Sequence, residues 1–279
     1  MENSKIEWTD HTANFWWGCF KVSPGCKNCY AETLANRYGK SIWGPVETTD
    51  REQKTGIWTE LLKWNRHAMK EQRRRRVFVQ SMGDFFEDHP QVSGWREDAL
   101  NLISKCKWLD FQILTKRPEN VNRMIADYAG DCEWLGENIG KDNDGRYSNI
   151  WIGTSIENQE MADLRIPELL NIPARVRFLS VEPLLEAVDL TGFTVDVVWL
   201  DNDYADKDPI LREIIVADGW PMHWVIVGVE SGNKRRPVDV AWARSIRDQC
   251  KAAGIPFFMK QIDKVQPIPA DLMIREFPE

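Results

Sequence analysis

Three cysteines near the start of the chain, Cys19, Cys26 and Cys29, are the residues whose type and spacing most strongly indicate chemistry. They form a C-x6-C-x2-C pattern, and no fourth cysteine lies nearby in the sequence. A closed structural metal site uses four protein ligands. Three thiolates on a cubane iron–sulfur cluster instead leave one iron free to bind another molecule, as a reactive cluster requires. The number of cysteines is therefore as informative as their spacing.

The other cysteines and the histidines do not extend this motif. Cys106 and Cys250 lie on apolar helical stripes and are expected to be core thiols, whereas Cys132 is isolated. Of the four histidines, His11 lies nearest to the motif and is expected to be a surface or loop residue rather than a ligand. In a reducing cytosol, clustered cysteines indicate metal binding or catalysis rather than disulfides.

Composition favours one large domain. The chain has 279 residues, of which 43% are hydrophobic, so a sizeable core can form. Its net charge of −7 argues against indiscriminate binding to a polyanion, although local basic patches remain compatible with it. We expect a cytoplasmic protein, because the first residues lack the apolar segment of a secretory signal and no apolar run is long enough to span a membrane.

Short apolar runs alternate with helical patterns along the chain. This alternation predicts an α/β fold with a parallel sheet, built as a full or partial (β/α) TIM-like barrel; a doubly wound open sheet is the alternative. Helices are predicted at 94–107, 118–128 and 238–253. Strands are predicted at 76–81, 111–115, 150–154, 176–181, 224–229 and 256–259, with an earlier one near 14–17 leading into the cysteines.

Three segments interrupt this alternation within a single domain, 1–279. Residues 130–148 and 201–221 are predicted to be inserted loops, and residues 265–279 an irregular C-terminal tail. Long loops in a compact domain commonly form lids or binding loops.

Polar residues follow each predicted strand. The carboxyl ends of parallel strands share one rim, where barrel active sites lie, and the cysteines follow the first strand onto that rim. Charges at the mouth of a buried sheet need partners, so Asp84 and Glu182 are predicted to contact a ligand. Thr115, Asn158 and Ser231 are equally well explained as caps or loop starts. The basic run at 234–236 lies on the same rim and could meet a phosphate, whereas the run at 73–76 lies at the opposite end and is expected to be solvated.

Together, the three cysteines and the polar strand ends of a parallel barrel resemble the radical S-adenosylmethionine superfamily. More narrowly, the chain resembles phage-encoded three-cysteine-motif proteins of phages and bacterial genomes. That likeness rests on the segments at 8–9, 14–19, 23–32, 81–86, 114–118 and 180–184. The superfamily usually has a C-x3-C-x2-C motif with an aromatic residue before the third cysteine. This chain has a longer first gap, Asn28 at that position, and Tyr30 after the third cysteine.

The resemblance implies a set of roles. Cys19, Cys26 and Cys29 would bind three irons of a [4Fe–4S] cluster, and S-adenosylmethionine would chelate the fourth. Reductive cleavage of this cofactor would yield a 5′-deoxyadenosyl radical that takes a hydrogen atom from the substrate, while the protein orients the reacting carbon. A flavodoxin or ferredoxin would supply the electron. The cofactor contacts implied are Gly83 and Asp84 for the amino group, Ser155 and Glu157 for the ribose, and Glu182 with the backbone of Gly228–Glu230 for the ribose or adenine.

The resemblance also suggests a substrate class. Related phage pathways build hypermodified DNA bases, so it implies a modified nucleobase, free or in DNA, and a rearrangement (isomerase) of an amino-acid-modified thymine. A flipped base would enter the barrel, and the protein would act in the host cytoplasm if phage-encoded. The residues implied to contact phosphates are Lys116, Arg117, Lys234, Arg235 and Arg236; no catalytic residue is assigned.

Two other functions remain open from the residues alone. A nucleic-acid-binding protein with a structural zinc would recruit His11 or another cysteine as the fourth ligand. A barrel enzyme of another reaction type would use Lys116 or Glu182 as its acid or base. Iron and sulfide would identify the radical enzyme, stoichiometric zinc the binding protein, and metal-free turnover the third function.

Overall fold

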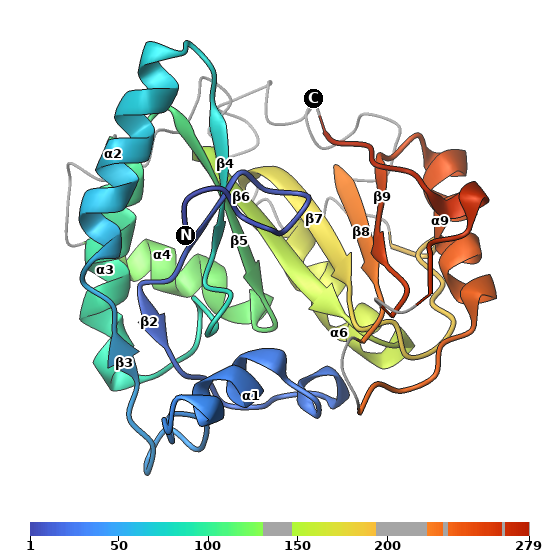
Figure 1. Cartoon of the computed structure of the whole chain (residues 1–279), viewed down its shortest axis with the longest axis horizontal. Coiled ribbons are helices and arrows are strands. Elements are labelled where there is room, and N and C mark those ends of the chain that lie inside the picture. The colour runs from blue at the N-terminus through green and yellow to red at the C-terminus, as the bar shows by residue number, and fades with distance from the viewer. Residues whose placement is uncertain (131–146, 194–221, 231–233, 264–265, 279) are drawn as a thin grey trace, which may run out of the picture.

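The structure is a computed structural model that describes residues 1–130, 147–193, 222–230, 234–263 and 266–278 (Figure 1). The two predicted insertions lie outside the described residues, apart from the ends of the first at Gly130 and Tyr147–Ser148. Within the described ranges, no helix combines the length and the apolar character that a membrane span requires.

Seven parallel strands form one curled sheet, a half-barrel whose spatial order follows the chain order (Figure 1). A doubly wound sheet would reverse its strand order partway along the chain, so that alternative is wrong and the partial barrel is confirmed. Within the described residues, the first and last strands are the two edges of the sheet. The strands are β1 (His11–Ala13), β4 (Arg75–Val79), β5 (Leu109–Thr115), β6 (Tyr147–Ile156), β7 (Ala174–Val181), β8 (Trp224–Gly228) and β9 (Phe257–Gln261).

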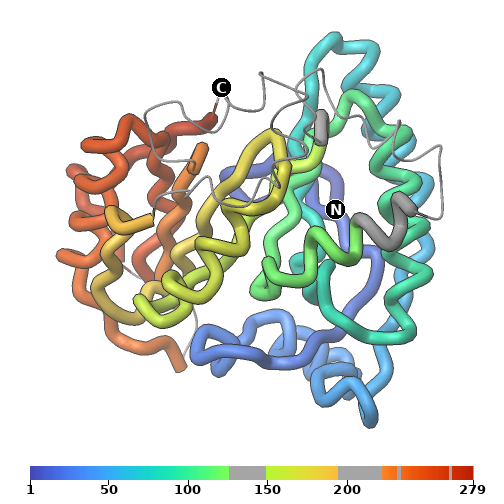
Figure 2. Tube along the Cα trace, turned by 180° about the vertical axis from the view of Figure 1, so that it is seen from behind, coloured from blue at the N-terminus to red at the C-terminus, as the bar shows by residue number. Residues whose placement is uncertain are grey.

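Helices pack on the convex face of this sheet, as the view from behind also shows (Figure 2). Their buried apolar side chains join those of the outward-facing strand positions in one core cluster. These helices are α2 (Ile57–Lys70), α3 (Pro90–Lys105), α4 (Val121–Gly130), α6 (Gln159–Leu170) and α9 (Val240–Ala253). The shorter elements are β2 (Trp16–Trp17), η1 (Pro24–Cys26), α1 (Tyr30–Arg37), β3 (Glu52–Gln53), η2 (Pro118–Asn120) and η4 (Ala270–Leu272).

The concave face carries a second apolar cluster, which we call the aromatic floor. Trp8, before β1, packs on Phe78 with ring centroids 4.6 Å apart and on Trp224 at 6.2 Å. A Cβ on Gly153 would lie 2.4 Å from the Phe178 ring, so this ring fills the space above β6. Among the described residues, these side chains fill this part of the concave face. The members of the aromatic floor are Trp8, Phe78, Trp151, Val176, Phe178, Trp224, Ile226 and Phe258.

Most predicted elements are present, with shifted ends. Each of the six strands predicted from residue 76 onward matches one of β4 to β9, and the predicted helices match α3, η2 with α4, and α9. Cys106 and Cys250 are fully buried, as expected of core thiols. The expected tail from 265 is largely irregular: it forms η4 and then runs beside β9, with an antiparallel bridge between Phe258 and Arg275.

Two expectations about the start of the chain are wrong. The first strand of the sheet is His11–Ala13, whereas Trp16–Trp17 pairs antiparallel with Glu52–Gln53 outside the main sheet. His11 is therefore a strand residue, only 8% exposed, with its ring stacked on Trp64 at 4.5 Å. Apolar content alone identified the tryptophans as the strand, but pairing with β4 selected the residues before them.

Candidate functional site

The cysteine loop, which we define as residues 19–29, begins just after the short strand β2. Gly18 forms a parallel bridge with Gly83, beyond the end of β4. A Cβ on Gly83 would lie 2.8 Å from the Gly18 carbonyl oxygen, so the two backbones approach too closely for a side chain. In both views the segment that continues into α1 lies across the carboxyl ends of the strands (Figures 1 and 2). The loop thus reaches the rim, as the sequence predicts.

All three cysteines line one cavity of about 170 Å³ on this rim. They are free thiols. Phe78 of the aromatic floor also lines the cavity, so the cavity lies directly above that floor. The other lining residues that were predicted to contact a ligand are Gly83, Asp84, Lys116, Arg117 and Ser155.

The three thiols could hold an iron–sulfur cluster. Among the described residues, no three His, Cys, Asp or Glu side chains are placed to hold a single metal ion. The thiolates of a [4Fe–4S] cluster stand farther apart than the ligands of one ion, because irons and sulfides separate them. Three soft sulfur donors around one cavity suit such a cluster. The ring of His11, proposed as a zinc ligand in the alternative, is instead stacked on Trp64 of α2.

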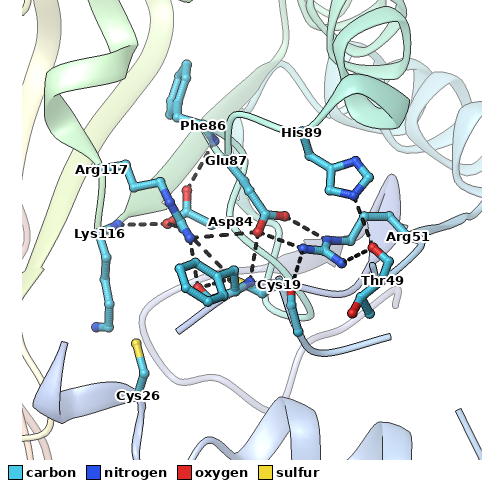
Figure 3. Close-up of polar contacts among 12 residues, drawn as sticks. Cys19, Cys26, Thr49, Arg51, Asp84, Phe86, Glu87, His89, Lys116 and Arg117 are labelled. Atoms are coloured by element: carbon cyan, nitrogen blue, oxygen red, sulfur yellow. Dashed lines mark hydrogen bonds and ion pairs between the residues drawn. The ribbon is translucent and has the colours of Figure 1, made fainter. Parts of the chain in front are cut away.

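A buried guanidinium lies beside Cys19. Arg117, just after β5, has its Nη1 3.8 Å from the Cys19 sulfur and donates through Nη2 to the Phe20 carbonyl at 2.7 Å (Figure 3). Desolvation raises the pKa of the Cys19 thiol, and the positive charge of Arg117 offsets this only in part. A bound metal would supply the further positive charge that a thiolate needs at this position.

Asp84 holds this guanidinium in place. Its carboxylate accepts from the Thr115 hydroxyl at 2.6 Å, from the Lys116 and Phe86 backbone amides at 2.9 and 3.1 Å, and from Arg117 Nη1 at 2.9 Å. Burial by itself raises the pKa of Asp84, but Arg117 and these hydrogen bonds outweigh it and hold the pKa below its ordinary value. A carboxylate offers about four acceptor positions, so these protein groups use its capacity. Its role in binding the cofactor amino group stays a prediction.

Sequence reasoning missed a second buried ion pair behind the cysteine loop. Glu87 is 1% exposed and accepts from Arg51 Nε at 2.9 Å and from the Phe20 amide at 2.8 Å. Arg51 also donates to the carbonyls of Thr49 and Gly44 (Figure 3). Arg51 and Glu87 are 36 residues apart in the sequence, in segments that showed no motif, so no signal in the chain pointed to the pair.

Lys116 differs from its neighbour Arg117. Within the part of the chain that the structure describes, its ammonium makes no hydrogen bond or ion pair, and its side chain extends toward Cys26 (Figure 3). It lines both the cysteine cavity and an adjoining groove of about 500 Å³ between the loop, η2 and α6. Phe20, Val22 and Arg117 also line both spaces, so these residues form the wall between them.

Glu157 contacts the cysteine loop, and its predicted contact with a ribose stays a prediction. It is fully buried at the end of β6 and accepts from the Gly25 amide at 2.9 Å and from Arg165 Nη1 at 3.0 Å. Burial by itself raises its pKa, but nearby Lys116 and Arg165 and the hydrogen bonds to the loop hold it below its ordinary value. Ser155, two residues earlier on the same strand, is 4% exposed and lines the cavity.

Glu230, after β8, also contacts the loop. Asn28 Nδ2 donates to its carboxylate at 3.2 Å, and Arg236 donates to it through its backbone amide at 2.8 Å and through its guanidinium. The other two predicted phosphate contacts near β8 lie beside this pair. Lys234 accepts from Asn28 Nδ2 through its carbonyl at 2.9 Å, and Arg235 donates to Asp263 at 3.2 Å.

Another charge pair, Glu182 with Lys260, lies on the other side of the rim. Lys260 of β9 donates to both carboxylate oxygens of Glu182, at 2.6 and 2.8 Å. A Cβ on Gly228 would lie 2.9 Å from the Glu182 carboxyl carbon, so this carboxylate covers the end of β8. Both side chains are partly exposed, at 22% for Glu182 and 24% for Lys260. The sequence marked Glu182 as a candidate but gave Lys260 no role.

A family model described as a protein of unknown function (DUF5131) matches residues 3–271 of the chain. This match runs from the segment before β1 into η4 and so includes the cysteine loop and every strand of the half-barrel. No curated protein and no solved structure matches the chain.

Proposed function

The chain belongs to this family of unknown function (DUF5131), and from its own site we propose that it is a radical S-adenosylmethionine enzyme. Cys19, Cys26 and Cys29 would hold a [4Fe–4S] cluster on the carboxyl rim of the half-barrel. The observation that carries the proposal is that three free thiols line one cavity directly above the aromatic floor.

The chain's own residues would bind and orient what enters this cavity. When bound, the cluster would supply the electron that cleaves S-adenosylmethionine to a radical able to take a hydrogen atom from a substrate. The aromatic floor excludes water from below, and Ser155 and Gly83 line the cavity wall. The Lys116 ammonium, which pairs with no carboxylate of the described residues, would attract a carboxylate or phosphate. The cavity volume of about 170 Å³ is below the roughly 300–1,000 Å³ of typical ligand sites. The cofactor would therefore need contacts outside this cavity, and Glu182, which does not line it, would supply one.

For the substrate, we propose a modified nucleobase or nucleotide, including the rearrangement of an amino-acid-modified thymine in phage DNA hypermodification. Arg117, Arg235 and Arg236 already pair with carboxylates of the protein. Of the predicted phosphate contacts, Lys116 and Lys234 form no ion pair with the residues that the structure describes. Few available cations favour a small substrate or one flipped base over a long DNA footprint. A flavodoxin or ferredoxin would deliver the electron in the cytoplasm.

Electron paramagnetic resonance tests this proposal on anaerobically reconstituted, dithionite-reduced protein, with and without S-adenosylmethionine. We expect a [4Fe–4S]⁺ signal whose shape changes when the cofactor is added, because the iron without a thiolate would coordinate it. Replacing any one of Cys19, Cys26 and Cys29 by alanine should abolish the signal and the bound iron and sulfide. Cys250→Ala is the matched control, because this buried core thiol is far from the motif in sequence and should leave the signal unchanged.

Three results would contradict the proposal. A [4Fe–4S]⁺ signal whose shape does not change when S-adenosylmethionine is added would indicate a structural or electron-transfer cluster. Stoichiometric zinc without iron would favour the nucleic-acid-binding alternative. Turnover by metal-free protein would favour a barrel enzyme that uses Lys116 or Glu182.

A further inference from the structure

We propose that charged side chains from the ends of β4, β5, β6 and β8 clamp the cysteine loop across the mouth of the half-barrel. Arg117, Glu157 and Arg236 are then positioning residues for the three thiols rather than ligand contacts. The purpose of the clamps rests on the proposed function, but their existence can be measured without any metal.

The first clamp grips the peptide groups of Phe20, the residue after Cys19. Its amide donates to Glu87 at 2.8 Å, and its carbonyl accepts from Arg117 at 2.7 Å. Glu87 and Arg117 are 1% and 7% exposed, and each is held by a further buried partner, Arg51 and Asp84 respectively. Hydrogen bonds to charged groups contribute more than neutral ones, so this peptide is firmly held on both sides.

The second clamp grips the middle of the loop. Glu157 accepts from the Gly25 amide, one residue before Cys26, and Arg165 fixes the other carboxylate oxygen at 3.0 Å. A Cβ on Gly25 would lie 2.9 Å from the Glu157 carboxyl carbon, so the loop backbone rests directly against this group. Arg165 in turn donates to the Ser155 carbonyl at 2.8 Å, which ties the clamp to β6.

The third clamp grips the loop on either side of Cys26, with its second contact directly before Cys29. Arg236 donates to the Pro24 carbonyl at 3.1 Å, and Glu230 accepts from Asn28, the residue before Cys29, at 3.2 Å. Arg236 and Glu230 also pair with each other. The loop is therefore attached near β5 at one end and near β8 at the other, and it spans the rim between them.

Backbone hydrogen bonds of Cys19 with Ile42 and Gly44, and of Cys29 with Thr33, hold the two ends of the loop, but its middle has little support apart from the clamps. Its regular structure is the single turn η1, closed by the Cys26 amide on the Ser23 carbonyl at 2.9 Å. Phe20 and Val22 are each 40% exposed, so its larger apolar side chains do not anchor it in the core. Burying charged groups costs free energy. We infer that these groups are present at the rim because they hold the loop in position. Preorganised ligands bind a metal centre more tightly than ligands on a mobile loop.

Alkylation of the cysteines in metal-free protein tests the clamps. We would compare Arg236→Ala with wild-type protein and measure, by peptide mass spectrometry, the rate at which iodoacetamide modifies Cys26 and Cys29. Loss of the Pro24 contact and the Glu230 pair should open the loop more often and raise these rates by about fivefold. Arg236 is on the surface side of its pair, with its side chain 27% exposed, so the variant is expected to fold.

Two further variants make the result specific. Arg244→Ala removes the surface pair between Arg244 of α9 and Asp271 of η4 and should leave the alkylation rates unchanged. Glu157→Ala should accelerate the modification of Cys26, whereas Glu157→Gln keeps an oxygen acceptor for the Gly25 amide and should restore most of the protection. Equal rates in wild-type, Arg236→Ala and Glu157→Ala proteins would overturn the clamps.

The outcome separates the clamps from the proposed function. If the variants expose the thiols but wild-type protein assembles no iron–sulfur cluster, the clamps stand and the radical chemistry fails. If wild-type protein forms the cluster and the variants do not change the alkylation rates, the proposed function stands and the clamps fail.

Discussion

Two ion pairs on the same rim, Asp84–Arg117 beside the cysteines and Glu182–Lys260 on the other side, differ in what surrounds them. The side chains of Asp84 and Arg117 are 7% and 8% exposed, and their remaining hydrogen bonds go to the backbone, to the Thr115 hydroxyl and to the cysteine loop. Glu182 and Lys260 bond to each other and are 22% and 24% exposed. Buried, fully used charges build the scaffold, whereas partly exposed charges keep capacity for a ligand.

The largest difference between the two regions should appear in stability. Asp84→Asn leaves the buried Arg117 without its closest counter-charge and turns an amide NH₂ toward backbone donors, so the free energy of unfolding should fall by about 3 kcal/mol. Glu182→Gln acts on a partly exposed pair and should cost less than about 1 kcal/mol. Urea unfolding of both variants measures this contrast. Equal losses would show that burial does not distinguish the two pairs.

Acid should remove the stability that the charge of Asp84 contributes to the folded protein. Its pKa in the folded protein lies below the ordinary value of 3.8, so the unfolded chain takes up the proton first as the pH falls. The stability that the charge contributes is complete above the ordinary value and is lost as the pH falls through the lower folded pKa. Urea unfolding of wild-type and Asp84→Asn proteins over a pH series should show a difference in the free energy of unfolding that is largest at neutral pH and decreases in acid. A difference independent of pH would mean that altered packing or hydrogen bonding, rather than the lost charge, explains the destabilisation by Asp84→Asn.

The smallest expected difference comes from two glycines, each of which faces a rim carboxylate, one buried and one partly exposed. A Cβ on Gly25 and one on Gly228 would each lie 2.9 Å from a glutamate carboxyl carbon, of Glu157 and Glu182 respectively. Glu157 is fully buried and held by Arg165, so Gly25→Ala should cost about 2 kcal/mol by overpacking. Glu182 is partly exposed and has room to move, so Gly228→Ala should stay within about 0.5 kcal/mol of wild type. Thermal unfolding compares the two, and a reversed order would contradict the difference in mobility.

The sequence predicted the sheet well because its strands are short and apolar and alternate with helices. Six strands and the shared rim followed from that alternation, and the cysteine motif placed the loop on the same rim. The first strand was mislocated because Trp16 and Trp17 look like a buried strand, while the shorter run at His11–Ala13 is selected by pairing with β4. Only spatial pairing distinguishes these two short segments.

Partners of the rim charges could not be predicted in the same way. Asp84, Glu157 and Glu230 were identified from the sequence as rim residues, but their hydrogen bonds join residues 33, 132 and 202 positions apart. A position on a strand determines which rim a side chain reaches. It does not determine which other group reaches the same point.

By itself, then, the sequence determined the fold class, the rim and the three thiols, because strand periodicity and chain order are local properties. The tertiary structure alone decided which charged groups are buried with all their hydrogen-bond partners and which remain partly exposed. That difference depends on burial and on partners from distant segments, and the free energy of a charge in a protein is set by these surroundings rather than by its neighbours in the chain.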